Sequence, residues 1–131
     1  RFCTPGVHIG LFCSTPMVAL SRNVPRKAAM EMLLTGEEID SETAEKFGLI
    51  NRAVADDALD PTVDDFCARI ADKSPLTLAI GKEAFYRQLE MGLDEAYDYA
   101  SQVMTENMLA RDAEEGIDAF LQKRPPVWQG K

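Results

Sequence analysis

Apolar and polar positions alternate over the first twelve residues and follow a helical period further along the chain. Val7, Ile9 and Leu11 recur at every second position, which is the spacing of side chains on one face of a β-strand. A Pro-Gly dipeptide at 5–6 interrupts this stretch and is typical of turns. The pattern predicts a short strand on either side of a bend.

Three short elements are predicted between this stretch and residue 54. A brief helix should run from residue 13 to about Leu20, with Ser14 or Thr15 as its cap. A second helix is predicted over 25–34, because its apolar residues form one stripe and Gly36 follows as a stop signal. Residues 40–48 predict a short third helix, since Asp40 can cap its start and a glycine ends it. Residues 49–54 are β-compatible.

From residue 60 onward the pattern is entirely helical. In the first of these helices, apolar residues fall at i, i+3, i+4, i+7 and i+8, namely Val63, Phe66, Cys67, Ile70 and Ala71. Two longer helices are predicted over about 75–90 and 94–110. The last helix should begin at Asp112, which together with Glu115 has the spacing of a capping box, and a Pro-Pro pair at 125–126 should end it. Two or three short strands cannot satisfy their own edges, so partner strands are expected from outside this sequence.

Composition and charge exclude several classes of function. The 131 residues are 46% hydrophobic, which is enough for one folded core. The 22 acidic and 14 basic residues give a net charge of −8, which repels nucleic acids and anionic membranes, and no apolar run reaches the length of a membrane span. The three cysteines form no metal or disulfide pattern, so a reducing compartment is expected. The chain opens on Arg1 without a starter methionine, which is expected of an internal fragment.

Four segments resemble the enoyl-CoA hydratase/isomerase (crotonase) family in order and spacing. They are FCTPGVHIGLF at 2–12, PRKAAMEMLLTG at 25–36, AEKFGLINRAV at 44–54 and EEGIDAFLQKR at 114–124. The resemblance implies an α/β fold class, in which residues 1–58 are the end of a crotonase-like β-β-α spiral core. Residues 59–131 would then be an all-helical C-terminal region that covers the acyl-CoA and makes oligomer contacts.

The resemblance also implies a chemistry. Two backbone N–H groups of the family form an oxyanion hole that stabilises a thioester enolate, and they are expected in an N-terminal half outside this sequence. The implied substrate is a coenzyme A thioester with no further cofactor and no metal, and the implied assembly is a homotrimer or a dimer of trimers. Hydration needs two glutamates as general acid and base. The second follows the proline of the family's P-E pair, and that position here is Gly6.

Each candidate site residue also has a plainer interpretation. Gly6 is either a reshaped pocket position or a turn residue. His8, the sole histidine, is a speculative replacement base, since Gly6 and His8 would share one face of a strand. Phe120 matches the family's aromatic residue near the acyl-CoA, with core packing as the alternative. Lys123 matches the lysine that reaches the coenzyme A phosphates, and otherwise it would complement the helix C-terminus.

Two functions follow as hypotheses. The first is an acyl-CoA enzyme of the hydratase/isomerase family, a lyase or isomerase of fatty acid metabolism whose hydratase activity is doubtful because of Gly6. The second is a non-catalytic crotonase-like subunit that binds acyl-CoA or stabilises an assembly. The expected location is the cytoplasm, with the mitochondrial matrix as the alternative if the source is eukaryotic. A helical interaction module acting alone fits least, because the predicted strands lack partners.

Overall fold

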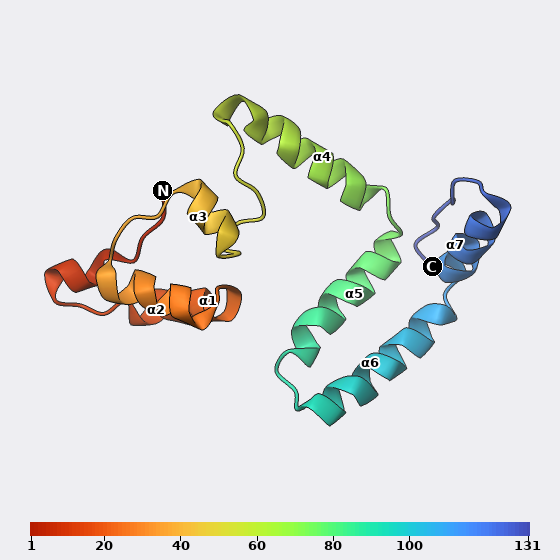
Figure 1. Cartoon of the computed structure of the whole chain (residues 1–131). Helices are drawn as coiled ribbons and strands as arrows, with labels where there is room; N and C mark the ends of the chain where they lie inside the picture. The colour runs from red at the N-terminus through yellow and green to blue at the C-terminus, as the bar shows by residue number, and fades with distance from the viewer. The chain divides into compact units, whose positions relative to one another are not determined.

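Helices supply all of the regular structure in this computed structural model, which describes residues 1–131. The chain divides into two units, Arg1–Leu59 and Asp60–Lys131, which are described separately below (Figure 1). The roles expected of residues 1–58 (end of the spiral core) and of residues 59–131 (acyl-CoA covering and oligomer contacts) stay predictions. None of the helices has both the length and the apolar character that crossing a membrane requires.

The predicted strands are absent. Residues Pro5–Ile9 form a 3₁₀-helix, η1, and residues 49–54 have no regular structure. The one β-type contact is an isolated antiparallel bridge in which Phe2 and Ile39 exchange backbone hydrogen bonds of 3.0 and 2.9 Å. The backbone groups of this stretch bond locally instead: the Leu11 N–H donates to the Gly6 carbonyl at 3.0 Å, and the Gly10 N–H donates to the Val7 carbonyl at 3.3 Å. The β-β-α part of the expected α/β fold class is therefore not present in these residues.

Unit 1 is built from α1 (Ser14–Asn23), α2 (Arg26–Thr35) and α3 (Ser41–Lys46), followed by the short 3₁₀-helix η2 (Asp56–Ala58). The residues that begin and end these helices are mostly those predicted. Gly36 ends α2 in the left-handed conformation with φ 66°, and the Asp40 carboxylate accepts a 2.8 Å hydrogen bond from the Thr43 N–H at the start of α3. Helix α1 ends three residues later than predicted, because its last backbone hydrogen bond joins the Val24 N–H to the Leu20 carbonyl.

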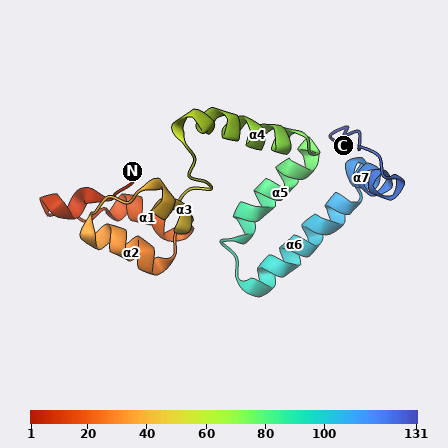
Figure 2. The same ribbon diagram turned by 45° about the horizontal axis from the view of Figure 1, so that its top comes forward.

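The core of unit 1 lies between α1 and α2, which pack against each other (Figure 2). Its buried residues include those of the predicted α2 stripe, and they are Leu20, Val24, Ala28, Ala29, Met32 and Leu33. The buried Thr4 hydroxyl donates a 2.8 Å hydrogen bond to the Met32 carbonyl. This bond attaches the N-terminal segment to α2, and the Phe2–Ile39 bridge attaches it to the residues between α2 and α3. Together they fix the residues that lead into η1.

Unit 2 contains α4 (Leu59–Ala71, whose first residue belongs to unit 1), α5 (Pro75–Gln88), α6 (Leu93–Met108) and α7 (Arg111–Gln122). Helices α5 and α6 form a hairpin that turns at residues 89–92 and is seen in both views (Figures 1 and 2). The helix ends lie within a few residues of the predicted ones. Helix α6 begins one residue before the predicted start at 94, because Gly92 occupies the N-cap position and Asp94 lies within the first turn.

A buried carboxylate, rather than an apolar core, joins the segments of unit 2. Asp112 is 1% exposed, and it accepts hydrogen bonds from the Ser74 hydroxyl (2.5 Å) and from the N–H groups of Gln129 (2.7 Å) and Gly130 (3.0 Å). The predicted capping box is therefore wrong: α7 begins one residue earlier, and Asp112 contacts groups distant in sequence. These bonds, first that from Ser74, lower the pKa of the Asp112 carboxyl.

Candidate functional site

Gly6 is closely surrounded by later residues of its own loop. Its N–H donates to the Cys13 sulfur at 3.3 Å, and its carbonyl accepts from the Leu11 N–H at 3.0 Å. A Cβ atom added to Gly6 would lie 2.8 Å from both the Leu11 carbonyl oxygen and the Cys13 sulfur. Such distances are shorter than van der Waals contact, and one of the atoms belongs to the backbone. The loop in this conformation therefore accepts only glycine at position 6.

His8 does not share a face with Gly6. In a 3₁₀-helix, residues three apart are aligned, so residues two apart point in different directions. The exposed His8 ring instead places Nε2 3.2 Å from the Gly36 carbonyl, at the end of α2. The premise of a strand is therefore wrong, and the role of His8 as a base stays a prediction.

The hydroxyls of the 13–18 segment have local roles. Ser14 is the first residue of α1, and its hydroxyl donates to the Phe12 carbonyl at 3.3 Å. Cys13 occupies the N-cap position without a side-chain cap bond. The predicted capping by Ser14 or Thr15 is therefore wrong, although the predicted start of the helix is within one residue.

Phe120 lines an apolar groove within unit 2. The groove encloses about 580 Å³, and α5, α6, α7 and the C-terminal segment contribute its walls, among them Met108, Ile117, Phe120, Leu121 and Trp128. Phe120 is 82% exposed within this chain, and the choice between acyl-CoA contact and core packing stays a prediction. An open groove of this size and apolar lining is the kind of surface that accepts a hydrophobic ligand group.

Lys123 follows the last residue of α7 and has an unusual backbone. Its φ of 53° and ψ of 41° place it in the left-handed region, and it is the only non-glycine residue of the chain with a positive φ. Its ammonium makes no ion pair within the chain, whereas the neighbouring Arg124 binds Glu115 through both terminal nitrogens at 2.6 and 2.9 Å. The two basic residues therefore differ in their contacts: Arg124 forms an ion pair with Glu115, and the Lys123 ammonium forms none within the chain.

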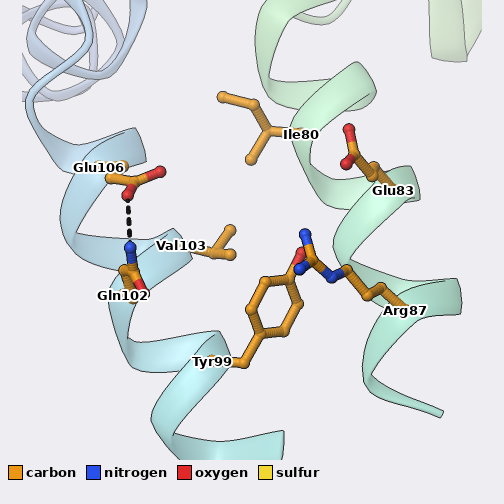
Figure 3. A pocket seen from close by; sticks show the side chains of 7 residues that line it. All are labelled: Ile80, Glu83, Arg87, Tyr99, Gln102, Val103 and Glu106. Atoms are coloured by element: carbon orange, nitrogen blue, oxygen red, sulfur yellow. Dashed lines mark hydrogen bonds between the residues drawn. The ribbon is translucent and has the colours of Figure 1, made fainter. Parts of the chain in front are cut away.

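A second hollow, of about 290 Å³, lies between α5 and α6 (Figure 3). Arg87 lies over the Tyr99 ring at 4.8 Å, and Gln102 donates to Glu106 at 3.0 Å. The Arg87 charge is thereby engaged by the aromatic face, and the wall also carries carboxylates. None of the predicted site residues lines this hollow, and its mixed polar lining assigns it no ligand.

Two residues that shape the α7 region, Trp128 and Glu115, are not among the candidate site residues predicted from the sequence. Trp128 lies against Gly116, where an added Cβ would meet the indole ring at 3.2 Å, and its Nε1 donates to the Asp72 carbonyl at 2.8 Å. Glu115 was interpreted only as part of a cap, yet it binds Arg124. The position of the sole tryptophan after two prolines was an available signal for the first, but no local pattern indicates the second, because nine residues separate the partners.

The comparisons with known proteins agree on one family. The family profile described as enoyl-CoA hydratase/isomerase matches residues 1–131. Among curated relatives, enoyl-CoA hydratase domain-containing protein 3, mitochondrial, from Rattus norvegicus is 50% identical over 127 residues, which cover 97% of this chain and 42% of the relative. Carnitinyl-CoA dehydratase from Citrobacter koseri is 31% identical over 135 residues, covering 99% of this chain and 52% of the relative. The chain thus spans about half the length of these relatives.

Solved structures give the same result. A crystal structure of enoyl-CoA hydratase from Mycobacterium smegmatis superposes with a TM-score of 0.92 at 49% identity, covering 97% of this chain and 49% of that one. Human enoyl Coenzyme A hydratase domain-containing protein 3 superposes with a TM-score of 0.90 at 50% identity, covering 97% of this chain and 50% of that one.

Proposed function

Because the chain belongs to the enoyl-CoA hydratase/isomerase family, we propose that it is the C-terminal part of a protein that binds acyl-coenzyme A thioesters and hydrates them poorly. Phe120 in the apolar groove contacts the thioester, and Lys123 contacts the coenzyme A phosphates. Support for this comes from the exposed aromatic ring, the unpaired ammonium three residues later and the similarity of 114–124 to the family's terminal helix.

The observation that carries the proposal on activity is the lack of space at Gly6. In the family pattern this position holds a glutamate that shares the acid and base work of hydration. Here the backbone carbonyl of Leu11 and the sulfur of Cys13 both lie 2.8 Å from any added Cβ. Glycine supplies no carboxylate at this position, and the closed loop has no room for one. Chemistry in which both the oxyanion hole and the proton-transfer group lie outside these residues, such as double-bond isomerisation, does not depend on a carboxylate at position 6.

The decisive experiment is turnover of crotonyl-CoA by the full-length protein that contains this chain. A positioned general acid or base contributes roughly 10²–10⁴-fold to rate, so hydration should be slower by about that factor than in a family member with both glutamates. Gly6→Glu should not restore the rate, because the loop leaves no room for the side chain. A kcat on the order of 10–10³ s⁻¹ for the unmutated protein would contradict this proposal. His8 would then be the first residue to substitute.

A second candidate is a non-catalytic crotonase-like subunit that binds acyl-CoA or stabilises an assembly. The closed loop at Gly6 favours it, since a subunit without chemistry does not need the carboxylate. The two candidates separate by experiment: tight crotonyl-CoA binding without hydration or double-bond isomerisation identifies the second. In either case the assembly we propose is a homotrimer or a dimer of trimers.

The compartment also belongs to this proposal. The relatives from rat and human carry "mitochondrial" in their names, which supports the mitochondrial matrix as the location of this protein. The expectation of a cytoplasmic location has no such support.

A further inference from the structure

Helix α7 ends in a motif that glycine normally closes. The Lys123 N–H donates to the Phe120 carbonyl at 3.2 Å, and the Arg124 N–H donates to the Ala119 carbonyl at 3.0 Å. This pair of bonds defines a Schellman motif, in which the residue at the Lys123 position takes the left-handed conformation and is usually glycine. A residue with a Cβ costs roughly 1 kcal/mol there. The chain therefore keeps a lysine where glycine would be more stable.

The residues on both sides of Lys123 are held in one hydrogen-bonded network. Arg124 donates to both oxygens of Glu115, and its Nε donates to the Gln122 side chain at 2.8 Å. Glu115 also accepts the Val127 N–H at 2.8 Å. The Lys123 side chain is the member of this stretch that the network leaves exposed and unpaired. The network thus fixes the backbone from which Lys123 projects.

The electrostatics of the network also favour a free lysine. The hydrogen bonds from Arg124, followed by that from Val127, lower the pKa of the Glu115 carboxyl to about 2, so it is ionised at neutral pH. Because Arg124 occupies both oxygens of this carboxylate, Glu115 is not available as a partner for Lys123. Without Arg124, the same carboxylate would attract the lysine and compete with an anionic ligand.

We propose that Glu115 and Arg124 are positioning residues, which hold Lys123 in the conformation that binds the phosphates of a coenzyme A thioester. The inference rests on the proposed function, in which Lys123 contacts those phosphates. It adds that the affinity depends on an ion pair that does not touch the ligand.

The test compares crotonyl-CoA with crotonyl-pantetheine, which has no phosphate, as ligands of the full-length protein. By calorimetry at low salt, Glu115→Gln should raise the Kd for crotonyl-CoA by roughly two- to five-fold, the range of one exposed charge contact. The Kd for crotonyl-pantetheine should not change. The sign is diagnostic, because removal of a negative charge should by itself tighten the binding of an anion. Glu114→Gln, which removes the adjacent exposed acid, is the matched control and should not weaken binding.

The other variants keep the test decisive. Lys123→Ala should weaken crotonyl-CoA binding by an amount that shrinks as salt rises. Lys123→Gly should weaken it equally but raise the melting temperature, because glycine suits the left-handed conformation. Arg124→Lys keeps the charge but cannot form the two-pronged contact, so it should lower the affinity for crotonyl-CoA alone and serves if Glu115→Gln does not fold.

The outcomes separate the two proposals. If Lys123→Ala leaves crotonyl-CoA affinity unchanged, the Lys123 contact of the proposed function is wrong. If Lys123→Ala weakens binding while Glu115→Gln and Arg124→Lys do not, only the positioning inference is overturned. If Glu115→Gln weakened the binding of crotonyl-CoA and crotonyl-pantetheine equally, Glu115 would have a general structural role, and the positioning inference would also be overturned.

Discussion

At the scale of single residues, position 6 lacks the side chain that hydration needs, and it also lacks the space to hold that side chain. Gly6 donates to the Cys13 sulfur and accepts from the Leu11 N–H, so both of its backbone groups help to close the loop. The closed loop then brings the Leu11 carbonyl to where a Cβ would be. Restoring a carboxylate there requires a different loop conformation as well as a different residue.

Gly6→Ala is expected to destabilise the full-length protein by about 1–3 kcal/mol, the cost of forcing an extra carbon into a close-packed site. Gly81→Ala is the control, because Gly81 lies within α5 and an added Cβ there meets nothing within 4 Å. The control should stabilise the protein by about 0.5–1 kcal/mol, through helix propensity. Urea denaturation measures both. Equal stability of Gly6→Ala and the parent protein would show that the loop opens readily, and a glutamate could then be accommodated.

At the scale of elements, α7 is held by contacts to distant segments rather than by its own caps. Asp112 receives hydrogen bonds from Ser74, which precedes α5, and from Gln129 and Gly130, which follow α7. The Ser74 hydroxyl also accepts from the Thr77 N–H at 3.2 Å, so one side chain caps α5 and binds α7. The wall of the groove that carries Phe120 therefore depends on a buried polar contact.

Asp112→Asn should lower the melting temperature at neutral pH, because a carboxylate with three donors becomes an amide that cannot serve them all. The pKa of Asp112 is lowered below its ordinary 3.8, so this stabilisation is complete above that value and is lost as pH falls through the lower folded value. The difference from the parent should shrink in acid. Ser74→Ala should cost about 2–4 kcal/mol, because it removes both the cap of α5 and a hydrogen bond to a buried carboxylate. The control is Asp118→Asn, which changes an exposed acid of α7 and should have the melting temperature of the parent protein at every pH. If Asp112→Asn also had the melting temperature of the parent at every pH, the structural role of Asp112 would be contradicted.

At the scale of the whole molecule, many large apolar side chains remain exposed. In unit 2, Leu93, Leu109 and Phe120 are each more than 70% exposed, and the fully buried side chains there include a serine and an aspartate. Exposed apolar surface of this extent marks interaction surfaces in soluble proteins. The net charge of −8 opposes self-association but does not cover that surface.

The isolated 131-residue chain should therefore be marginally stable or should associate. Sedimentation velocity over a range of concentrations is the measurement, with the full-length protein as the control. Association that rises with concentration is the expected result, because the uncovered helical faces bury apolar area on contact. A compact monomer of 14.5 kDa that unfolds cooperatively would contradict the view that these residues need a partner.

The sequence by itself determined the elements whose causes are local. The α2 stripe, its stop at Gly36 and the cap at Asp40 were predicted from neighbouring residues, because helix periodicity and capping act within one or two turns. The family was identified in the same way, from motifs that keep their order along the chain, and the profile match confirms it.

Tertiary structure decided what depends on groups distant in sequence. Residues 5–9 form a 3₁₀-helix instead of a strand, with their backbone groups bonded within the turn, and the alternation of apolar residues does not reveal this. Asp112 has the spacing of a cap but receives its bonds from Ser74 and Gln129, which only the folded chain brings together. The sequence placed glycine at position 6, and the fold decided that the backbone of Leu11 leaves room for nothing larger. Distances between atoms far apart along the chain are set by packing, which no local pattern encodes.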